Sequence, residues 1–330
     1  MRVVCLGGGH GLHATLQAMR LVTTDITAIV CVGDDGGSSG RLREEFGVLP
    51  PGDIRMALSA LASEQAQKRG VVELLQHRFT SEGDLNGHAL GNLILTAQWQ
   101  RDRDILKGIR SVQTIFGIDG TVLPGAKVPL NLTAEVQDPA TGEVSLVHSQ
   151  REVAKARGKI LSLHINPEDP PAFDEAVEAI EAADVVTLGP GSWYSSLLVH
   201  MLVPGIREAL HRTSAQKILL MNLVADWETT GLDVQGQIEA FRAYSDNLAV
   251  DAILTGDSSS QETLPPTAAR VFHRRIATSR NSGVHDPVRL ASAFKDVLED
   301  LTQARAQTDE SVEMMREAVE NLDDGVGEVA

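Results

Sequence analysis

The chain has 330 residues, of which 42% are apolar and 22% charged, so most of it is expected to fold around a buried core. Its 29 basic and 45 acidic side chains give a formal net charge of −16, which argues against nucleic acid or an anionic membrane as the main partner. Two cysteines, Cys5 and Cys31, are too few for a disulfide scaffold and are expected to be reduced and buried.

The opening residues predict the first unit of a parallel sheet. Residues 2–6 form a β-rich run, residues 7–11 a glycine turn, and residues 12–19 repeat apolar side chains at helical spacing. A second β-branched run follows at residues 26–32, and this order is typical of an α/β protein with right-handed crossovers. The first residues lack the apolar stretch and cleavage site of a signal peptide, so the protein is expected in the cytoplasm.

The middle of the chain combines helices with a β insertion. Apolar spacing predicts an amphipathic helix that begins with Asp53 as its N-cap. Two β-rich runs, 128–136 and 144–147, flank a glycine-containing turn and predict a hairpin. We expect this hairpin to be an insertion at about residues 121–165, with a small separate lobe as the alternative.

The second half repeats the opening pattern. Helical spacing at residues 173–180 precedes a strand at 185–188, a glycine turn and a helix over 197–202. The further expected elements are strands at 218–224 and 252–255 and a closing helix at 290–301. The longest uncharged run, 185–206, is interrupted by Gly, Pro and Ser, so no integral membrane contact is expected.

These patterns together predict one Rossmann-like α/β domain over residues 1–305, with a doubly wound, mostly parallel sheet and the β-hairpin insertion. Residues 306–330 contain eight acids and one base, a net charge of −7. They are expected to form an acidic, frayed C-terminal tail.

The first candidate ligand site is the turn GGGHGL. Gly9, Gly11 and Ala14 match the pattern G-x-G-x-x-G/A between a strand and a helix, where the backbone approaches a pyrophosphate at the helix N-terminus. A tight turn without a ligand is the alternative. The candidate contacts here are Gly8, Gly9, His10, Gly11 and Leu12.

The segment VGDDGGSSGRLR forms the second candidate, at the end of the second strand. A dinucleotide enzyme needs one acid there, whereas this chain has two acids, then small residues and arginine. Asp34 or Asp35 suits a ribose, a sugar hydroxyl or a phosphate-bound Mg²⁺, and Arg41 suits a phosphate. A flexible acidic loop is the alternative. The candidate contacts are Asp34, Asp35, Gly36, Gly37, Ser38, Ser39 and Arg41.

Two further segments, LPPGDIR and GHALGN, add polar side chains. In the first, Gly52, Asp53 and Arg55 are candidate contacts, with a pure N-cap as the alternative role for Asp53. In the second, a helix is expected over residues 86–95, and Asn92 is suited to hydrogen-bond a ligand through its amide.

The segment LGPGSWYSS is a second glycine turn before a helix, at the carboxyl end of a strand, where ligands of open α/β sheets bind. The candidate contacts in it are Gly189, Pro190, Gly191 and Ser192. The later segment WETTG adds Glu228, for which a loop cap is the alternative. His10 and His13 have the spacing of metal ligands, but no later Cys or His pair completes a zinc set, so no metal site is expected.

Taken together, GGGHGL, DDGGSSGRLR, PPGDIR, GHALGN and GPGSWYSS resemble the YvcK-like gluconeogenesis factor family, which is related in fold to the CofD 2-phospho-L-lactate transferases. The resemblance spans residues 7 to about 231. It implies a cytoplasmic, Rossmann-like protein that binds a UDP-sugar of the UDP-N-acetylglucosamine type and supports cell shape and cell-wall synthesis on gluconeogenic carbon. The sequence departs from the family at His10, where Thr is usual, and WETTG is a looser match than the other segments.

The resemblance establishes no catalytic activity, so a ligand-binding regulator is expected; if the protein is an enzyme, phospho-group transfer is the expected chemistry. No cofactor is expected beyond Mg²⁺ with a nucleotide diphosphate. The resemblance also suggests a homo-oligomer and cell-wall synthesis proteins as partners. A CofD-like 2-phospho-L-lactate transferase is the alternative, because it shares the first glycine loop and the paired acids. A nicotinamide oxidoreductase is favoured by the first loop alone.

Overall fold

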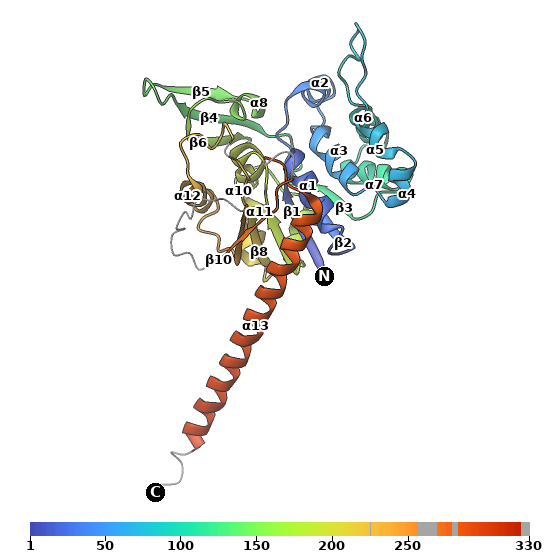
Figure 1. Ribbon diagram of the computed structural model, residues 1–330. Helices are drawn as coiled ribbons and strands as arrows, with labels where there is room; N and C mark the ends of the chain where they lie inside the picture. Colours follow the sequence, from blue (N-terminus) through green and yellow to red (C-terminus); the bar gives the residue numbers. More distant parts are fainter. Residues whose placement is uncertain (225, 257–268, 279–282, 325–330) are drawn as a thin grey trace.

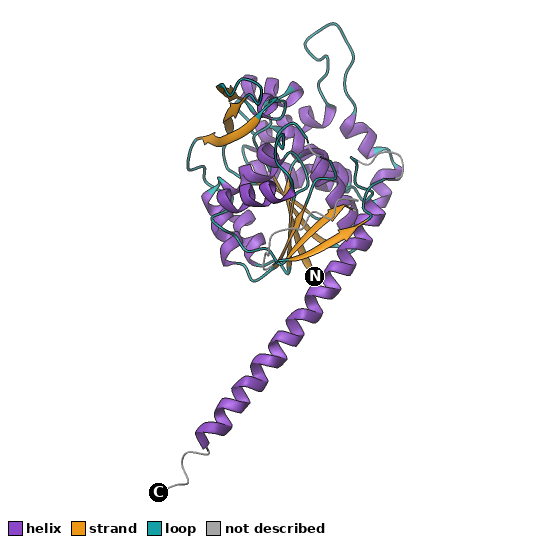
Figure 2. Ribbon diagram, turned by 60° about the vertical axis from the view of Figure 1, so that its left-hand side comes forward, coloured by secondary structure: helices purple, strands orange, loops and turns teal. Residues whose placement is uncertain are grey.

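The computed structural model is built around a seven-stranded parallel sheet with the order β10-β9-β8-β7-β1-β2-β3. It describes residues 1–224, 226–256, 269–278 and 283–324, with 308–324 described as backbone only. Helices cover both faces of the sheet (Figures 1 and 2). The strands are β1 (Arg2–Gly7), β2 (Asp25–Val30), β3 (Thr121–Pro124), β7 (Val185–Leu188), β8 (Gln216–Leu220), β9 (Ala252–Gly256) and β10 (Arg270–Arg274).

The strand order reverses between β1 and β7. The chain builds β1, β2 and β3 toward one edge, and later builds β7 to β10 on the other side of β1. The central strands are buried on both faces, which explains their continuous apolar runs: Val3, Val4 and Leu6 of β1 are at most 2% exposed. The predicted Rossmann-like, doubly wound fold is therefore confirmed, and its switch point lies between β1 and β7.

Helices connect most of the strands, with six of them, α2 to α7, between β2 and β3. They are α1 (Gly9–Met19), α2 (Gly37–Phe46), α3 (Pro51–Ala60), α4 (Glu64–Lys68), α5 (Val71–Gln76), α6 (Leu90–Asp102), α7 (Ile105–Phe116), α8 (Gln150–Val153), α9 (Asp174–Glu181), the π-helix η1 (Trp193–Leu198), α10 (Val199–Met201), α11 (Pro204–Arg212), α12 (Val234–Tyr244) and α13 (Pro287–Asp324). No helix in the described ranges is long and apolar enough to cross a membrane.

The predicted hairpin is present, within a second, smaller sheet. The strands β4 (Asn131–Gln137) and β5 (Val144–His148) pair antiparallel, and β6 (Lys159–Asn166) pairs antiparallel with the other edge of β4. The predicted start of the insertion at residue 121 is wrong, because β3 pairs with β2 and is an edge strand of the main sheet. The insertion therefore begins after β3.

Three predicted helix boundaries differ from the structure. The segment expected as a glycine-rich loop begins helix α2 at Gly37, because Ser38, Ser39 and Leu42 have a buried face to pack. The helix expected from residue 86 begins at Leu90 instead. The tail expected to fray from residue 306 continues α13 to Asp324, and Figure 1 shows these last turns extending beyond the sheet.

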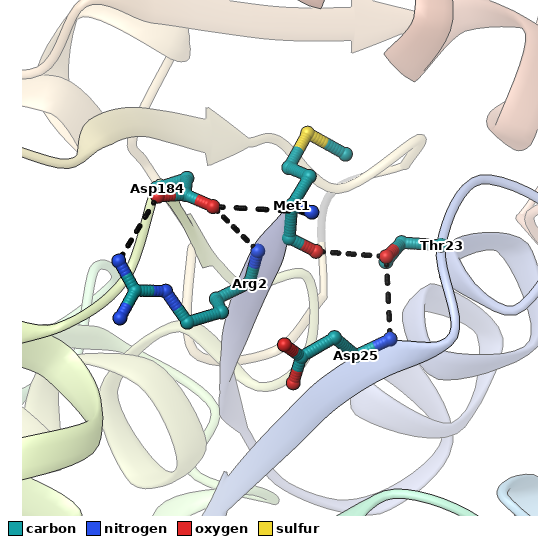
Figure 3. Close-up of polar contacts among 5 residues, drawn as sticks. All are labelled: Met1, Arg2, Thr23, Asp25 and Asp184. Carbon is teal, nitrogen blue, oxygen red and sulfur yellow. Dashed lines mark hydrogen bonds and ion pairs between the residues drawn. The ribbon is translucent and has the colours of Figure 1, made fainter.

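The N-terminus is fastened between β2 and β7 (Figure 3). Asp184 accepts hydrogen bonds from the Arg2 amide at 2.7 Å and from the Arg2 guanidinium at 3.3 Å, and the amide bond in particular lowers the pKa of this carboxyl. The Thr23 hydroxyl donates to the Met1 carbonyl at 2.8 Å and accepts from the Asp25 amide at 3.2 Å. These contacts fix where β1 starts. They therefore also fix the position of the glycine turn that follows its carboxyl end.

Candidate functional site

The two predicted glycine turns meet at the switch point between β1 and β7. A Cβ atom at Gly11 would lie 2.1 Å from the carbonyl oxygen of Pro190 and 2.8 Å from Cα of Gly191, so no larger residue fits at position 11 without displacing the second turn. Gly189 and Gly191 have φ angles of +78° and +143°, which favour glycine. The tertiary structure thus brings together segments that are about 180 residues apart in the chain.

Helix α1 begins at this junction, where the Asp53 carboxyl accepts a hydrogen bond from the Gly9 amide. Its N-cap, Gly8, is extended with φ −158°, and no acidic residue lies in its first turn. The amides of a helix N-terminus carry partial positive charge, so this end attracts an anion. The side chain of Leu12 is buried in the core and its amide donates to the Gly8 carbonyl at 3.2 Å, so Leu12 packs the turn and does not face a ligand as predicted. His10 is exposed at the mouth of the junction.

Two carboxylates lie beside this turn. A Cβ at Gly8 would lie 2.5 Å from Oδ2 of Asp53, and a Cβ at Gly52 would lie 2.5 Å from Oδ2 of Asp34, so both glycines leave room for an acid. Burial and the neighbouring Asp34 carboxylate raise the pKa of Asp53 to about 7, while a hydrogen bond from the Gly9 amide acts in the opposite direction. The predicted N-cap role of Asp53 is wrong, because Pro50 is the N-cap of α3 and Asp53 lies inside the first turn.

The second acid of the pair, Asp35, holds the insertion in place. Its carboxylate accepts hydrogen bonds from the amides of Gln150 and Arg151 at 3.1 Å each, at the start of α8. The Gln150 side chain then donates to the carbonyl of Ser195 at 2.7 Å. Asp35 therefore contributes to structure as well as lying near the predicted site, and Gln150 is a contact that the sequence analysis missed.

Two serines of α2 make hydrogen bonds to several neighbouring segments of the predicted site. The Ser38 hydroxyl lies 3.0 Å from Nδ2 of Asn92 and 2.9 Å from Nδ1 of His88, and the Ser39 hydroxyl accepts from the Gly52 amide at 3.0 Å. Both serines are at most 3% exposed. They connect the starts of α2, α3 and α6, so all three predicted segments converge on one place.

Two predicted contacts, Arg55 and Asn92, retain buried polar atoms without a hydrogen-bond partner. Arg55 is 4% exposed, with Nε and Nη1 unpaired, and Asn92 is 1% exposed, with Oδ1 unpaired. Burial, with the positive charge of Arg78 as the next cause, lowers the pKa of Arg55 to about 10. Gly91 makes room for this arginine, since a Cβ there would lie 2.8 Å from Cγ of Arg55. Unpaired buried donors and acceptors are rare in folded proteins and mark this region as a candidate for function.

A cavity of about 230 Å³ opens at the junction of the two glycine turns. The polar side chains that line it are His10, Asn222, Asp226 and His285. Asn222 donates to the Gly191 carbonyl at 2.8 Å and accepts from the Gly191 amide at 3.1 Å, which holds the second turn open. The sequence analysis missed Asn222, although its place just beyond the carboxyl end of β8 is a usable signal.

Glu228 occupies the other helix start. Its carboxylate accepts hydrogen bonds from the amides of Tyr194 and Ser195 at 2.6 and 3.1 Å, and from the Ser195 hydroxyl. Glu228 is 1% exposed, and burial raises its pKa to about 7. The start of η1 is thus filled by a carboxylate of the chain itself, so Glu228 is the loop cap, the alternative to its predicted ligand role. Ser192, by contrast, is only partly buried at the N-cap of η1.

Arg41 lines a different cavity, of about 760 Å³, which we call the arginine cavity. It lies between α2, the turn at residues 86–87, and the insertion, and shares no lining residue with the cavity at the glycine turns. Asp35 lines this cavity, whereas Asp34 does not. The predicted phosphate contact at Arg41 therefore lines a different cavity from the one at the start of α1.

Comparison with known proteins places these features in a wider group. The family model described as 2-phospho-L-lactate transferase CofD matches residues 3–286. A putative gluconeogenesis factor of Mycobacterium tuberculosis is 43% identical over 288 residues, covering 86% of this chain and 82% of that protein. The gluconeogenesis factor of Listeria monocytogenes is 36% identical, covering 82% and 83%. A crystal structure of a UPF0052 family member from Bacillus halodurans superposes with a TM-score of 0.78 at 32% identity, covering 88% and 97%.

Proposed function

This chain belongs to the CofD-like gluconeogenesis factor family, and from that membership and the site geometry we propose that it binds a nucleotide diphosphate sugar of the UDP-N-acetylglucosamine type. It acts in the cytoplasm as a ligand-responsive factor that supports cell shape and cell-wall synthesis during growth on gluconeogenic carbon. Its partners in this role are cell-wall synthesis proteins and further copies of the chain.

The observation that carries the proposal is the glycine-turn start of α1 at the strand-order switch point, packed against the second glycine turn. Ligands of open α/β sheets bind at this place, and a diphosphate is stabilised by the amides of a helix N-terminus. The two glycine-turn helix starts differ in how far carboxyl groups of the chain engage them: Glu228 accepts from two amides of η1, whereas Asp53 accepts from one amide of α1, that of Gly9.

The neighbouring cavity suits the nucleoside. At about 230 Å³ it accommodates part of a nucleotide sugar, with the diphosphate and sugar extending along the first turn. Nε2 of His285 is buried without a hydrogen-bond partner, and Asp226 lies on the same wall, so the cavity offers polar groups to a base or ribose.

The carboxylates of Asp34 and Asp53 suit the sugar hydroxyls or a magnesium ion bound with the diphosphate. Mg²⁺ is usually held by one or two carboxylates together with substrate phosphates, and Asp34 is close enough to raise the pKa of Asp53. These two residues would hold the ion, which would offset their mutual repulsion and the charge of the phosphates.

A CofD-like phospho-group transferase is the second candidate, favoured by the family match over residues 3–286. It uses the same switch-point cleft but requires a second substrate and a chemical step. A ligand-binding factor requires neither. Deazaflavin-dependent transfer of a phospholactyl group by the purified protein would decide for the transferase.

The experiment is a thermal-shift panel of UDP-N-acetylglucosamine, UDP-glucose, UDP, GDP, NAD and NADP, each with and without Mg²⁺. A ligand at about 100 times its Kd stabilises the native state by roughly 2.7 kcal/mol, which raises the melting temperature of a chain this size on the order of 5 °C. We expect the two UDP-sugars to give the largest shifts and Asp34→Asn to reduce them, with the exposed Asp169→Asn as the matched control. A shift with only the nicotinamide nucleotides, or only with GDP, would reject the UDP-sugar.

A further inference from the structure

We propose that the arginine cavity is a second binding site, which takes a small phosphate monoester. Its walls carry three guanidinium groups, from Arg41 and Arg43 of α2 and Arg151 of α8. Two segments far apart in the chain therefore place cations around one concave space. At about 760 Å³ this space is large enough for a whole metabolite.

Arg41 and Arg43 are positioned without being neutralised. Arg41 donates to the carbonyls of Asp84 and Asn86 at 2.8 and 2.7 Å, and Arg43 donates to the Leu130 carbonyl at 3.1 Å and to Oδ1 of Asn131. Neutral oxygens orient a guanidinium but leave its charge in place. The donors that remain on each fork are available to an anion.

None of the ion pairs within the described residues involves Arg41, Arg43 or Arg151. Two acids, Asp35 and Glu44, also line the cavity. The three arginines outnumber these two acids, of which Asp35 is hydrogen-bonded to the amides of α8. In a chain of net charge −16, such a concave cationic region concentrates a small anion.

A phosphate monoester fits this arrangement better than a mono- or dicarboxylate, because a single group carries both the charge and the acceptor oxygens. It carries close to two charges at neutral pH and three acceptor oxygens, and the guanidinium fork matches phosphate geometry. Asn86 and Asn131 border the same space and offer polar groups to the remainder of the molecule.

The second site adjoins the proposed nucleotide-sugar site through α2. Ser38 lines the arginine cavity, while the next residue, Ser39, accepts a hydrogen bond from Gly52 beside Asp34. If the proposed function is correct, the two ligands lie near neighbouring residues of the first turn of α2. Occupation of the arginine cavity itself does not depend on the nucleotide sugar.

The test is calorimetry on the full chain with glycerol 3-phosphate, with succinate and glycerol as comparison compounds. We expect glycerol 3-phosphate to bind, and Arg151→Gln and Arg41→Gln each to weaken binding about tenfold, the loss expected for one charge-assisted hydrogen bond. Arg157→Gln is the matched control, because Arg157 belongs to the same insertion but packs over Trp227 and does not line the cavity. Melting curves confirm that each variant is folded.

The outcomes separate this site from the proposed function. Absence of glycerol 3-phosphate binding, equal binding of succinate, or equal affinity in Arg151→Gln, Arg41→Gln and the wild type would overturn the proposal. Loss of glycerol 3-phosphate binding in the presence of saturating UDP-N-acetylglucosamine would show one shared site and would also overturn it. If UDP-N-acetylglucosamine does not bind at all while the arginine variants behave as expected, only the proposed function fails.

Discussion

Glu228 accepts hydrogen bonds from both the amide and the hydroxyl of Ser195, which lies 33 residues earlier in the chain. A carboxylate of the protein itself therefore accepts the hydrogen bonds at the start of η1. The carbonyl of Ser195 in turn accepts a hydrogen bond from the side chain of Gln150, and the backbone N–H of Gln150 donates to Asp35. A continuous polar network therefore joins the loop after β8, the π-helix, the insertion and the acidic loop after β2.

Glu228→Gln is expected to destabilise the fold. The glutamine presents an NH₂ group toward donors that need an acceptor, and a buried unsatisfied group costs roughly 1 to 3 kcal/mol. Urea unfolding measures the change. Glu239→Gln, on the exposed face of α12, is the control and should leave the midpoint unchanged. An unaltered midpoint in Glu228→Gln would show that the network contributes little to stability.

Asp53→Asn is expected to change how stability depends on pH in the ligand-free protein. Because the pKa of Asp53 is raised from 3.8 to about 7, the folded protein retains a proton that the unfolded chain releases. The contribution of this group to stability therefore decreases as the pH rises from about 4 to about 7. Melting temperatures of the variant and the wild type across this range should diverge, with the wild type losing stability relative to Asp53→Asn as the pH rises. Parallel curves would contradict the raised pKa.

Gly11→Ala is expected to disrupt the junction of the two glycine turns. The new methyl group would lie 2.1 Å from the Pro190 carbonyl oxygen, and relieving such an overlap typically costs 1 to about 3 kcal/mol. The melting temperature and UDP-N-acetylglucosamine binding should both decrease. Gly83→Ala is the control, since no atom lies within 4 Å of a Cβ at that position. Unchanged ligand binding in Gly11→Ala would separate this junction from the site.

Removal of residues 308–330 is expected to leave the fold intact. Among the side chains of α13 that the structure describes, the buried ones run from Leu290 to Leu301 and precede the cut. Thermal melting should show a change of no more than a few degrees. A longer truncation that removes residues 293–330 deletes Phe294, Val297 and Leu301, and should unfold the protein. A large loss of stability in the shorter truncation would show that the last turns of α13 dock on a partner surface.

The sequence alone determined the repeated unit of strand, glycine turn and helix, and with it the fold class. The runs that became β1, β2, β7 and β9 are apolar because a parallel sheet buries both faces of its strands, and this pattern is local and readable. The glycines at the strand ends were also readable, since a turn that approaches another backbone excludes a side chain.

The tertiary structure alone decided which carboxyl group of the chain lies at each of the two helix starts. GGGHGL and LGPGSWYSS look equivalent in the sequence, but Glu228 folds back onto the second from a loop more than thirty residues away. The contact of Asp35 with the start of α8 and the gathering of Arg41, Arg43 and Arg151 arise in the same way, from segments far apart in the chain. The local spacing of apolar residues encodes the helices and strands. The pairing of charged groups between them depends on how they pack. This packing decides where the protein's own carboxylates lie and which polar groups remain available to a ligand.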